Sequence, residues 1–167
     1  MDGFRVHKAN AADLDVVLAI LDEAARWLIT RGIQQWPSPF PRVVVERDFE
    51  TNTVWLASLD GHPIATASTL TSDPMFWGDL TDNAWYLHRL AIRRHEAGAG
   101  RQFLEWIERQ AASSGVEYMR LDCCVGLRAY YEKAGYKLQS SVSLLNATSA
   151  PPRSRWFCYE KSLAMLS

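Results

Sequence analysis

Apolar and polar positions along the chain change their period several times, and each period predicts one kind of element. The run FRVHKA at residues 4–9 alternates as a half-buried strand does. Apolar residues then recur every three or four positions over residues 14–28, which predicts an amphipathic helix that ends near Gly32. Asn10 and Asp13 precede this helix at the spacing of a capping box.

Proline and glycine interrupt the pattern that follows. The run QQWPSPFP at residues 34–41 cannot continue a helix, because proline lacks a backbone donor and favours extended neighbours. Residues 43–49 predict a short second helix. Two strand-like runs within residues 53–71 flank Asp60-Gly61, a dipeptide typical of hairpin turns. Residues 72–84 predict a loop with exposed aromatic side chains.

The rest of the chain alternates strands with helices. Strand patterns occupy residues 84–92, 116–125, 136–145 and 155–163, and helical patterns occupy residues 101–114 and 127–135. The polar residues 146–154 join the last two strands. Since no repeat and no linker divides the chain, we expect one domain over residues 1–167. Its fold class is α/β (α+β), with helices packed on a mixed sheet.

Composition narrows the class of protein. The 167 residues are 48% hydrophobic and include seven tryptophans, enough for a substantial core. A net charge of −1 argues against a general nucleic-acid binder. No apolar run approaches the roughly 20 residues that cross a bilayer, so we expect no membrane segment. The N-terminus has no apolar secretory region. Three cysteines are too few for a disulfide framework, which favours the cytoplasm. Because no CxxC or HExxH occurs, we expect no metal.

Gly98 and Gly100 are the first candidates for chemistry. They stand between a predicted strand and a helix that begins near Arg101. A helix N-terminus presents unpaired N–H groups and partial positive charge, and glycine lets a phosphate approach closely. The sequence has no Walker A motif, and a dinucleotide-binding GxGxxG motif would need glycine or alanine where Phe103 stands. A phosphate cradle of another kind and a plain loop turn remain.

Two longer segments, residues 85–111 and 118–137, resemble the GNAT superfamily of acyl-CoA-dependent N-acetyltransferases. The N-terminal strand and helix with RGIQQWP are similar to one branch of it. The family's loop Q/R-x-x-G-x-G/A reads HEAGAG at residues 95–100, with histidine in the first position. The family's late pattern Y-x-x-x-G-F/Y reads YEKAGY from Tyr131. The resemblance implies a mostly antiparallel sheet of six to seven strands, flanked by about four helices and splayed between the fourth and fifth strands.

The resemblance also implies how acetyl-CoA is bound. Backbone N–H groups of the loop would hold the pyrophosphate, with Arg93, Arg94 and Arg101 adding positive charge. The fourth strand would pair with the pantetheine arm as an added strand does. The expected acetyl-CoA-binding residues are Leu90, Ala91, Ile92, His95, Glu96, Ala97, Gly98, Ala99, Gly100 and Arg101. The asparagine that relatives carry after the fifth strand is missing here, where only CVG follows Cys123. A CoA-binding module with impaired catalysis is therefore an alternative.

Catalysis would need an acid and a route for an amine proton. The resemblance makes Tyr131 the general acid toward the departing thiolate, with Tyr130 as its neighbour. An alkylammonium has a reference pKa of about 10.4, so Asp122 and His88 are candidates for the base. A backbone N–H near Ile92 would polarise the thioester carbonyl. An acetyl-cysteine route through Cys123 or Cys124 lacks a motif-placed histidine or acid.

Aromatic side chains suggest where the acceptor binds. Trp36, Trp77 and Trp85 are expected to line its pocket, which suits an apolar or cationic small molecule. Further candidates are Trp27, Gln35, Phe40 and Phe76. No acidic run marks a polyamine site and no basic stripe marks a tRNA site. The favoured function is acetyl transfer from acetyl-CoA to a small-molecule amine, and the family is compatible with a homodimer. Alternatives are a protein or peptide acceptor and a nicotinamide-dependent reductase.

Overall fold

A seven-stranded sheet forms the centre of the protein. The computed structural model describes residues 3–94, 98–144 and 154–164. The strand order is β1-β2-β3-β4-β5-β7-β6, and all neighbours are antiparallel except the parallel pair β4–β5. The strands are β1 (Phe4–Lys8), β2 (Thr53–Leu59), β3 (His62–Leu70), β4 (Ala84–Ile92), β5 (Tyr118–Cys123), β6 (Lys137–Leu144) and β7 (Ser154–Ser162). The predicted mixed, mostly antiparallel sheet is confirmed.

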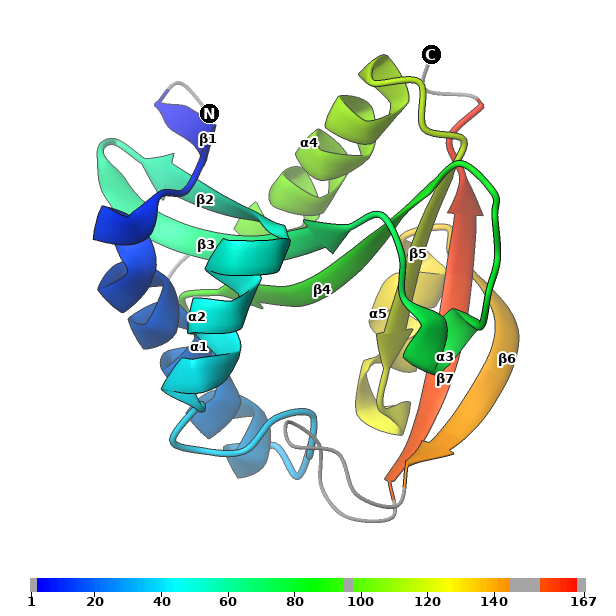
Figure 1. Ribbon diagram of the computed structural model, residues 1–167. Coiled ribbons are helices and arrows are strands. Elements are labelled where there is room, and N and C mark those ends of the chain that lie inside the picture. The colour runs from blue at the N-terminus through cyan, green and yellow to red at the C-terminus, as the bar shows by residue number, and fades with distance from the viewer. Residues whose placement is uncertain (1–2, 95–97, 145–153, 165–167) are drawn as a thin grey trace.

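Helices cover both faces of this sheet (Figure 1). They are α1 (Leu14–Thr30), α2 (Arg42–Thr51), α3 (Pro74–Trp77), α4 (Ala99–Ser113) and α5 (Arg128–Lys133). Helices α1 and α2 enclose one apolar core around Ile20 and Leu21, and α4 encloses a second around Phe103 and Leu104. Within the described ranges, no helix combines the length and apolarity needed to cross a membrane.

Local sequence signals explain the N-terminal elements. The Asn10 side chain accepts a hydrogen bond from the Ala12 N–H, and the Asn10 N–H donates to Asp13, which completes the predicted capping box. In the hairpin, Asp60 and Gly61 have φ values of 49° and 83°. Two positive φ angles in succession are what a type I′ turn requires. The helix and the hairpin predicted from the sequence are both confirmed.

Two differences from the prediction have a clear local cause. Residues 72–84 are not entirely loop, because α3 forms a single helical turn there with Pro74 at its start. One turn is too short to show a period in the sequence. Helix α4 begins at Ala99 rather than near Arg101, because Gly98 adopts a left-handed conformation and serves as the N-cap.

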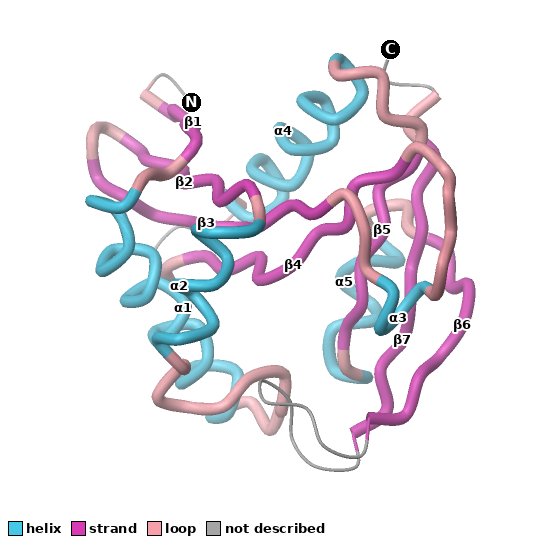
Figure 2. Tube along the Cα trace, in the orientation of Figure 1, coloured by secondary structure: helices cyan, strands magenta, loops and turns pink. Residues whose placement is uncertain are grey.

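The strands β4 and β5 separate along their length. They pair only where Ala84–Leu87 lie beside Tyr118–Leu121, so β4 has no β5 partner from His88 onward. Figure 2 shows the two strands diverging beyond that point. The predicted splay between the fourth and fifth strands is confirmed. Pairing with β3 gives β4 one extra residue between His88 and Ala91, a bulge in which Arg89 has a φ of 54°.

Candidate active site

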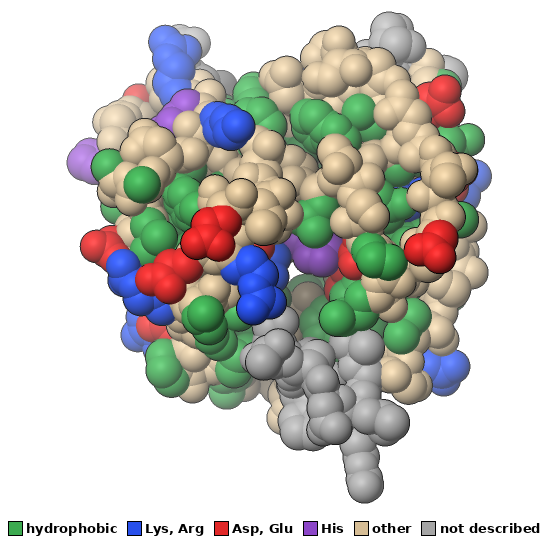
Figure 3. Space-filling view, in the orientation of Figure 1, with side chains coloured by type: hydrophobic (Ala, Val, Ile, Leu, Met, Phe, Trp, Pro, Cys, Tyr) green, Lys and Arg blue, Asp and Glu red, His purple; other side chains and the backbone are tan. Residues whose placement is uncertain are grey.

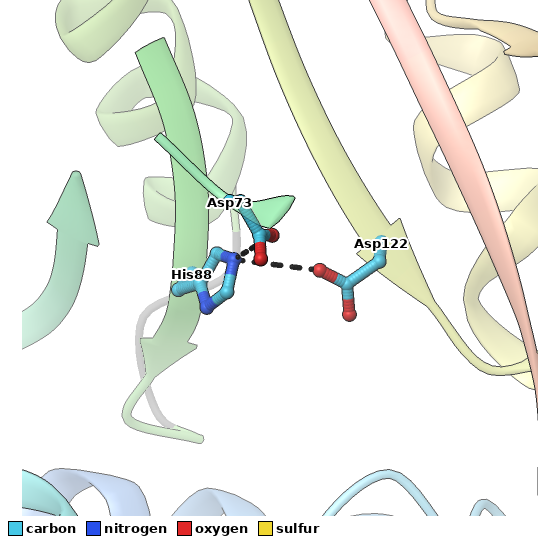
Figure 4. Close-up of side chains that lie close together, drawn as sticks. All are labelled: Asp73, His88 and Asp122. Atoms are coloured by element: carbon cyan, nitrogen blue, oxygen red, sulfur yellow. Dashed lines mark hydrogen bonds and ion pairs between the residues drawn. The ribbon is translucent and has the colours of Figure 1, made fainter. Parts of the chain in front are cut away.

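Three ionisable side chains meet at the gap between the separating strands (Figure 4). His88 extends from β4, Asp122 from the end of β5, and Asp73 from the loop before α3. His88 Nε2 lies 2.8 Å from Asp73 Oδ2 and 3.5 Å from Asp122 Oδ1. The splay therefore brings together His88 and Asp122, both named as candidates for the base. Sequence reasoning missed Asp73, because it lies in a loop without periodicity.

The electrostatics of the cluster favour proton exchange near neutral pH. Burial alone would lower the pKa of His88, but the hydrogen bond to Asp73 and the charge of Asp122 outweigh burial and raise it. Burial raises the pKa of Asp122 to about 6, and the charge of Asp73 adds to this while His88 opposes it. Because each affects the pKa of the other, His88 and Asp122 titrate as a coupled pair. The cluster can accept a proton at a pH where ordinary carboxylates cannot.

The same three side chains form a donor set that could hold a metal ion. Each offers one ligand atom, and these atoms lie within 4.8 Å of one another. One imidazole and two carboxylates would suit a divalent cation. The sequence pattern does not predict this cluster, since the residues are far apart in the chain. The three groups also stabilise one another without a metal, through the hydrogen bond and the ion pair that join them.

A cavity of about 290 Å³ opens beside the cluster. Figure 3 shows this hollow, with histidine and carboxylate atoms at its back and apolar side chains around it. The lining side chains include Gln35, Trp36, Val44, Arg47, Asp48, Met75, Phe76, Arg89 and Trp156. They come from α2, α3, β4, β7 and the segment after α1. Residues distant in sequence thus enclose one space that adjoins His88 and Asp122.

The carboxylate of Asp48, which has three partners, holds Arg89 at the wall of this cavity. The Arg89 Nη1 atom lies 2.9 Å from Asp48 Oδ2. Asp48 is only 3% exposed and also accepts hydrogen bonds from Ser68 Oγ at 2.9 Å and Asn52 Nδ2 at 2.8 Å. The left-handed backbone of Arg89 is uncommon for a residue with a side chain, and such strain gathers at functional sites. Sequence reasoning missed both residues.

The start of α4 fits a phosphate group. No described side chain caps this helix, so its first N–H groups lack partners within the helix. A Cβ atom at Gly100 would lie 3.0 Å from Ile92 Cδ1 and 3.2 Å from the Tyr130 hydroxyl. Gly100 therefore lets the helix start approach β4 closely. Of the expected loop, His95, Glu96 and Ala97 lie outside the described residues.

The arginines near this loop are engaged within the protein. Arg93 pairs with Glu23 and donates to the Pro63 carbonyl, and Arg101 pairs with Glu105. The Arg94 guanidinium lies 3.9 Å from the centroid of the Trp27 ring. Intramolecular ion pairs thus balance the charge of two of the three arginines.

Two adjacent tyrosines on α5 have different surroundings. Tyr131 is buried, its ring 5.9 Å from that of Tyr136, and burial raises its pKa well above the usual value, with Cys123 and Tyr130 adding to the effect. The Tyr130 hydroxyl instead faces Gly100, and 38% of this residue is exposed. Tyr131 therefore keeps its proton at physiological pH.

The shortened loop after β5 is a single 3₁₀ turn, Val125–Leu127. It is fixed by a hydrogen bond of 2.9 Å from the Cys124 N–H to Gln35 Oε1. The three cysteines are buried, and burial raises the pKa of each thiol. This disfavours the thiolate that an acetyl-cysteine route would need.

The predicted acceptor residues are divided among several places. Trp36 lines the cavity, as do the further candidates Gln35 and Phe76. Trp85 stacks on Trp55, with ring centroids 6.3 Å apart, in the core beneath α4. Trp77 packs edge-on against Tyr86 beside a second hollow. Of the β4 residues, Leu90 packs toward the core beneath α4, Ala91 is buried toward α1, and Ile92 lies against Gly100.

Comparison with known proteins places this geometry in one family. Residues 21–136 match the acetyltransferase (GNAT) family. YesJ of Bacillus subtilis, described as an uncharacterized N-acetyltransferase, is 28% identical over 153 residues, covering 84% of this chain and 85% of YesJ. A GNAT acetyltransferase structure from Listeria monocytogenes superposes with a TM-score of 0.74 at 23% identity, covering 95% of this chain and 94% of that one. The ribosomal-protein-S18-alanine N-acetyltransferase of Escherichia coli gives 0.71 at 15% identity, covering 97% and 95%.

Proposed function

The chain belongs to the acetyltransferase (GNAT) family, and from this premise we propose that it transfers the acetyl group of acetyl-CoA to a primary amine of a small molecule. The observation that carries the proposal is the Asp73–His88–Asp122 cluster, which lies in the splay beside a cavity of about 290 Å³. A concave, partly aromatic cavity favours a small acceptor over a protein surface, which would need an open groove. Residues 1–167 would act as one catalytic domain.

Acetyl-CoA would be held along β4 and at the start of α4. The first N–H groups of α4, at Ala99, Gly100 and Arg101, would bind the pyrophosphate, with residues 95–97 completing the loop. The edge of β4 from Leu90 to Ile92, which has no β5 partner, would pair with the pantetheine arm. The bound thioester supplies the acyl group.

Asp122 and His88 would take the proton from the acceptor. An alkylammonium must become neutral before its nitrogen can attack a carbonyl carbon. Asp122 has a pKa of about 6 and is mostly ionised at neutral pH, so it can accept this proton. The hydrogen bond between His88 Nε2 and Asp73 Oδ2 would hold the imidazole in place beside Asp122, which faces the same nitrogen.

Tyr131 would return a proton to the departing sulfur. Its raised pKa keeps the hydroxyl protonated, so a proton is available for the thiolate. A backbone N–H near Ile92 would polarise the thioester carbonyl. No cysteine takes part, so the amine attacks the thioester directly.

The test is amine-dependent release of the CoA thiol. Purified protein is mixed with acetyl-CoA and a panel of small amines, and thiol formation is followed with and without each amine. We expect at least one amine to raise the rate well above hydrolysis. Tight binding of acetyl-CoA without stimulation by any amine or peptide would favour a CoA-binding module. Binding of NAD without CoA would favour a reductase.

A further inference from the structure

We infer that the acceptor is a zwitterion, an apolar α-amino acid or a close analogue, whose carboxylate is bound by Arg89 and Arg47 while its amine faces Asp122 and His88. This rests on the proposed acetyl transfer and adds the class of acceptor. The observation behind it is that one cavity carries two arginines as well as the acidic cluster.

The negative groups of the cavity are not equally available to a ligand. Asp48 already accepts hydrogen bonds from two neighbours and pairs with Arg89, so its charge is balanced within the protein. Asp73 is bonded to His88. Among the residues that the structure describes, Asp122 makes one ion pair, a loose one of 3.5 Å with His88. The cavity therefore offers a place for one ammonium group rather than several.

Two guanidinium groups of the cavity keep N–H donors that could bind a ligand. The Arg89 guanidinium has five N–H donors, and the pairing with Asp48 engages Nη1. Arg47 lies on the exposed side of α2 and lines the cavity, and among the described residues its side chain has no ion pair. A planar guanidinium matches a carboxylate in shape and charge. Two such groups in one cavity favour a ligand with an anionic end.

The charged side chains that line the cavity favour a zwitterion over a polyamine. Arg47, Arg89 and His88 supply up to three positive charges, and Asp48, Asp73 and Asp122 supply up to three negative charges. A cavity for a polycation would carry an excess of carboxylates, because unpaired like charges oppose binding. A near-balanced cavity matches a ligand that carries one charge of each sign.

The remaining walls favour an apolar side chain. Trp36 stands edge-on to Phe40, with ring centroids 5.7 Å apart, which fixes its orientation. Phe76 of α3 and Trp156 of β7, with ring centroids 5.9 Å apart, add a second aromatic surface. A volume of about 290 Å³ is at the small end for ligand pockets, which suits an amino acid.

The experiment compares matched acceptors that differ only at the carboxylate. Phenylalanine, leucine and methionine are each tested beside the corresponding decarboxylated amine and carboxamide, with a spermidine and a short peptide amide as further acceptors. Wild-type protein is compared with Arg47→Gln and with Arg109→Gln, an exposed arginine of α4 outside the cavity. Arg47→Gln should raise KM for the amino acid about tenfold and leave KM for the decarboxylated amine unchanged. Arg109→Gln should change neither.

A second variant tests Arg89 without removing the positive charge beside Asp48. Arg89→Gln would leave Asp48 without its cation, so Arg89→Lys is used, which keeps the charge but loses the planar fork. It should also raise KM selectively for the amino acid. The inference would be overturned if the decarboxylated amines, spermidine or the peptide amide were acetylated as efficiently as the amino acids. In that case the proposed acetyl transfer would still stand. Acetylation of no acceptor would remove the proposed function together with this inference.

Discussion

Asp122 shows at the scale of one residue how function and stability oppose each other. Its carboxylate lies at the end of β5 in a buried site, where burial raises its pKa from the ordinary 3.8 to about 6. Because the folded protein then binds this proton more tightly than the unfolded chain, the stability that the protonated form provides is lost as the pH rises toward 6. Above that pH the folded protein carries a charge that its surroundings disfavour.

Replacing Asp122 with asparagine should therefore separate the two effects. Asp122→Asn is expected to lower kcat by about a hundredfold or more, because the base is gone. Above about pH 7 the variant should be more stable than wild type by on the order of 1–3 kcal/mol, and this difference should disappear below about pH 4. Urea unfolding across the pH range measures the stability, and a pH–rate profile shows whether the limb near pH 6 is lost. A variant that is less stable than wild type at high pH would contradict this account.

Tyr131 and Tyr130 provide a matched pair for the role of the acid. Tyr131→Phe removes the hydroxyl proposed to protonate the thiolate and is expected to lower kcat by about 10²- to 10⁴-fold, with little change in the melting temperature. Tyr130→Phe alters the exposed neighbour and should leave kcat within a few-fold of wild type. Steady-state kinetics on both variants shows which of the two tyrosines acts as the acid. Equal losses from the two substitutions would remove the specific role given to Tyr131.

At the scale of elements, what the sequence could predict depended on length and on local signals. Helix α1 has seventeen residues and follows a short turn with a capping box, and the β2–β3 hairpin has a turn of two residues with positive φ. Both carry enough local information to be recognised. Helix α3 has four residues, and its position depends on contacts with distant strands, which no local pattern records.

The start of α4 can be tested with two glycines of equal geometry. Gly98 and Gly61 have φ values of 85° and 83°, and a Cβ atom at either would meet nothing within 4 Å. Gly98→Ala and Gly61→Ala should each cost about 1 kcal/mol of stability, because both force alanine into a left-handed conformation. Only Gly98→Ala should weaken the binding of acetyl-CoA, measured by calorimetry. Equal affinities in the two variants would count against a phosphate site at α4.

The segment that carries Asp73 and Phe76 is fastened to the sheet by Arg120. This side chain is 3% exposed, pairs with Asp82 and with Glu160 at 2.8 Å, and its guanidinium lies 5.1 Å from the Trp77 ring. Arg120→Met should lower the free energy of unfolding by about 3–5 kcal/mol, because it leaves carboxylates without a cation. Chemical denaturation measures this, and Arg120→Lys, which retains a charge, should lose less. A loss below 1 kcal/mol for Arg120→Met would show that other contacts hold the segment.

At the scale of the whole molecule, the sequence predicted the family and the fold but only part of the cavity. The strand-and-glycine pattern around Gly98 and Gly100 and the YEKAGY segment were sufficient for the family, and the match over residues 21–136 agrees. His88 and Asp122 could be named because each lies on a strand of predicted position. The sequence could not identify the other cavity residues Asp48, Asp73 and Arg89. Their positions at the cavity depend on a β-bulge, a one-turn helix and the packing of α2 against the sheet.

The most direct test of the central claim follows the acetyl group itself. The protein is incubated with deuterated acetyl-CoA and the best acceptor from the amine panel, and the acceptor is analysed by mass spectrometry. The account predicts that the label appears as an amide on the acceptor nitrogen for wild type, and at a much lower rate for Asp122→Asn and Tyr131→Phe. Label found only in free acetate, or on the protein rather than on any acceptor, would contradict direct transfer to an amine.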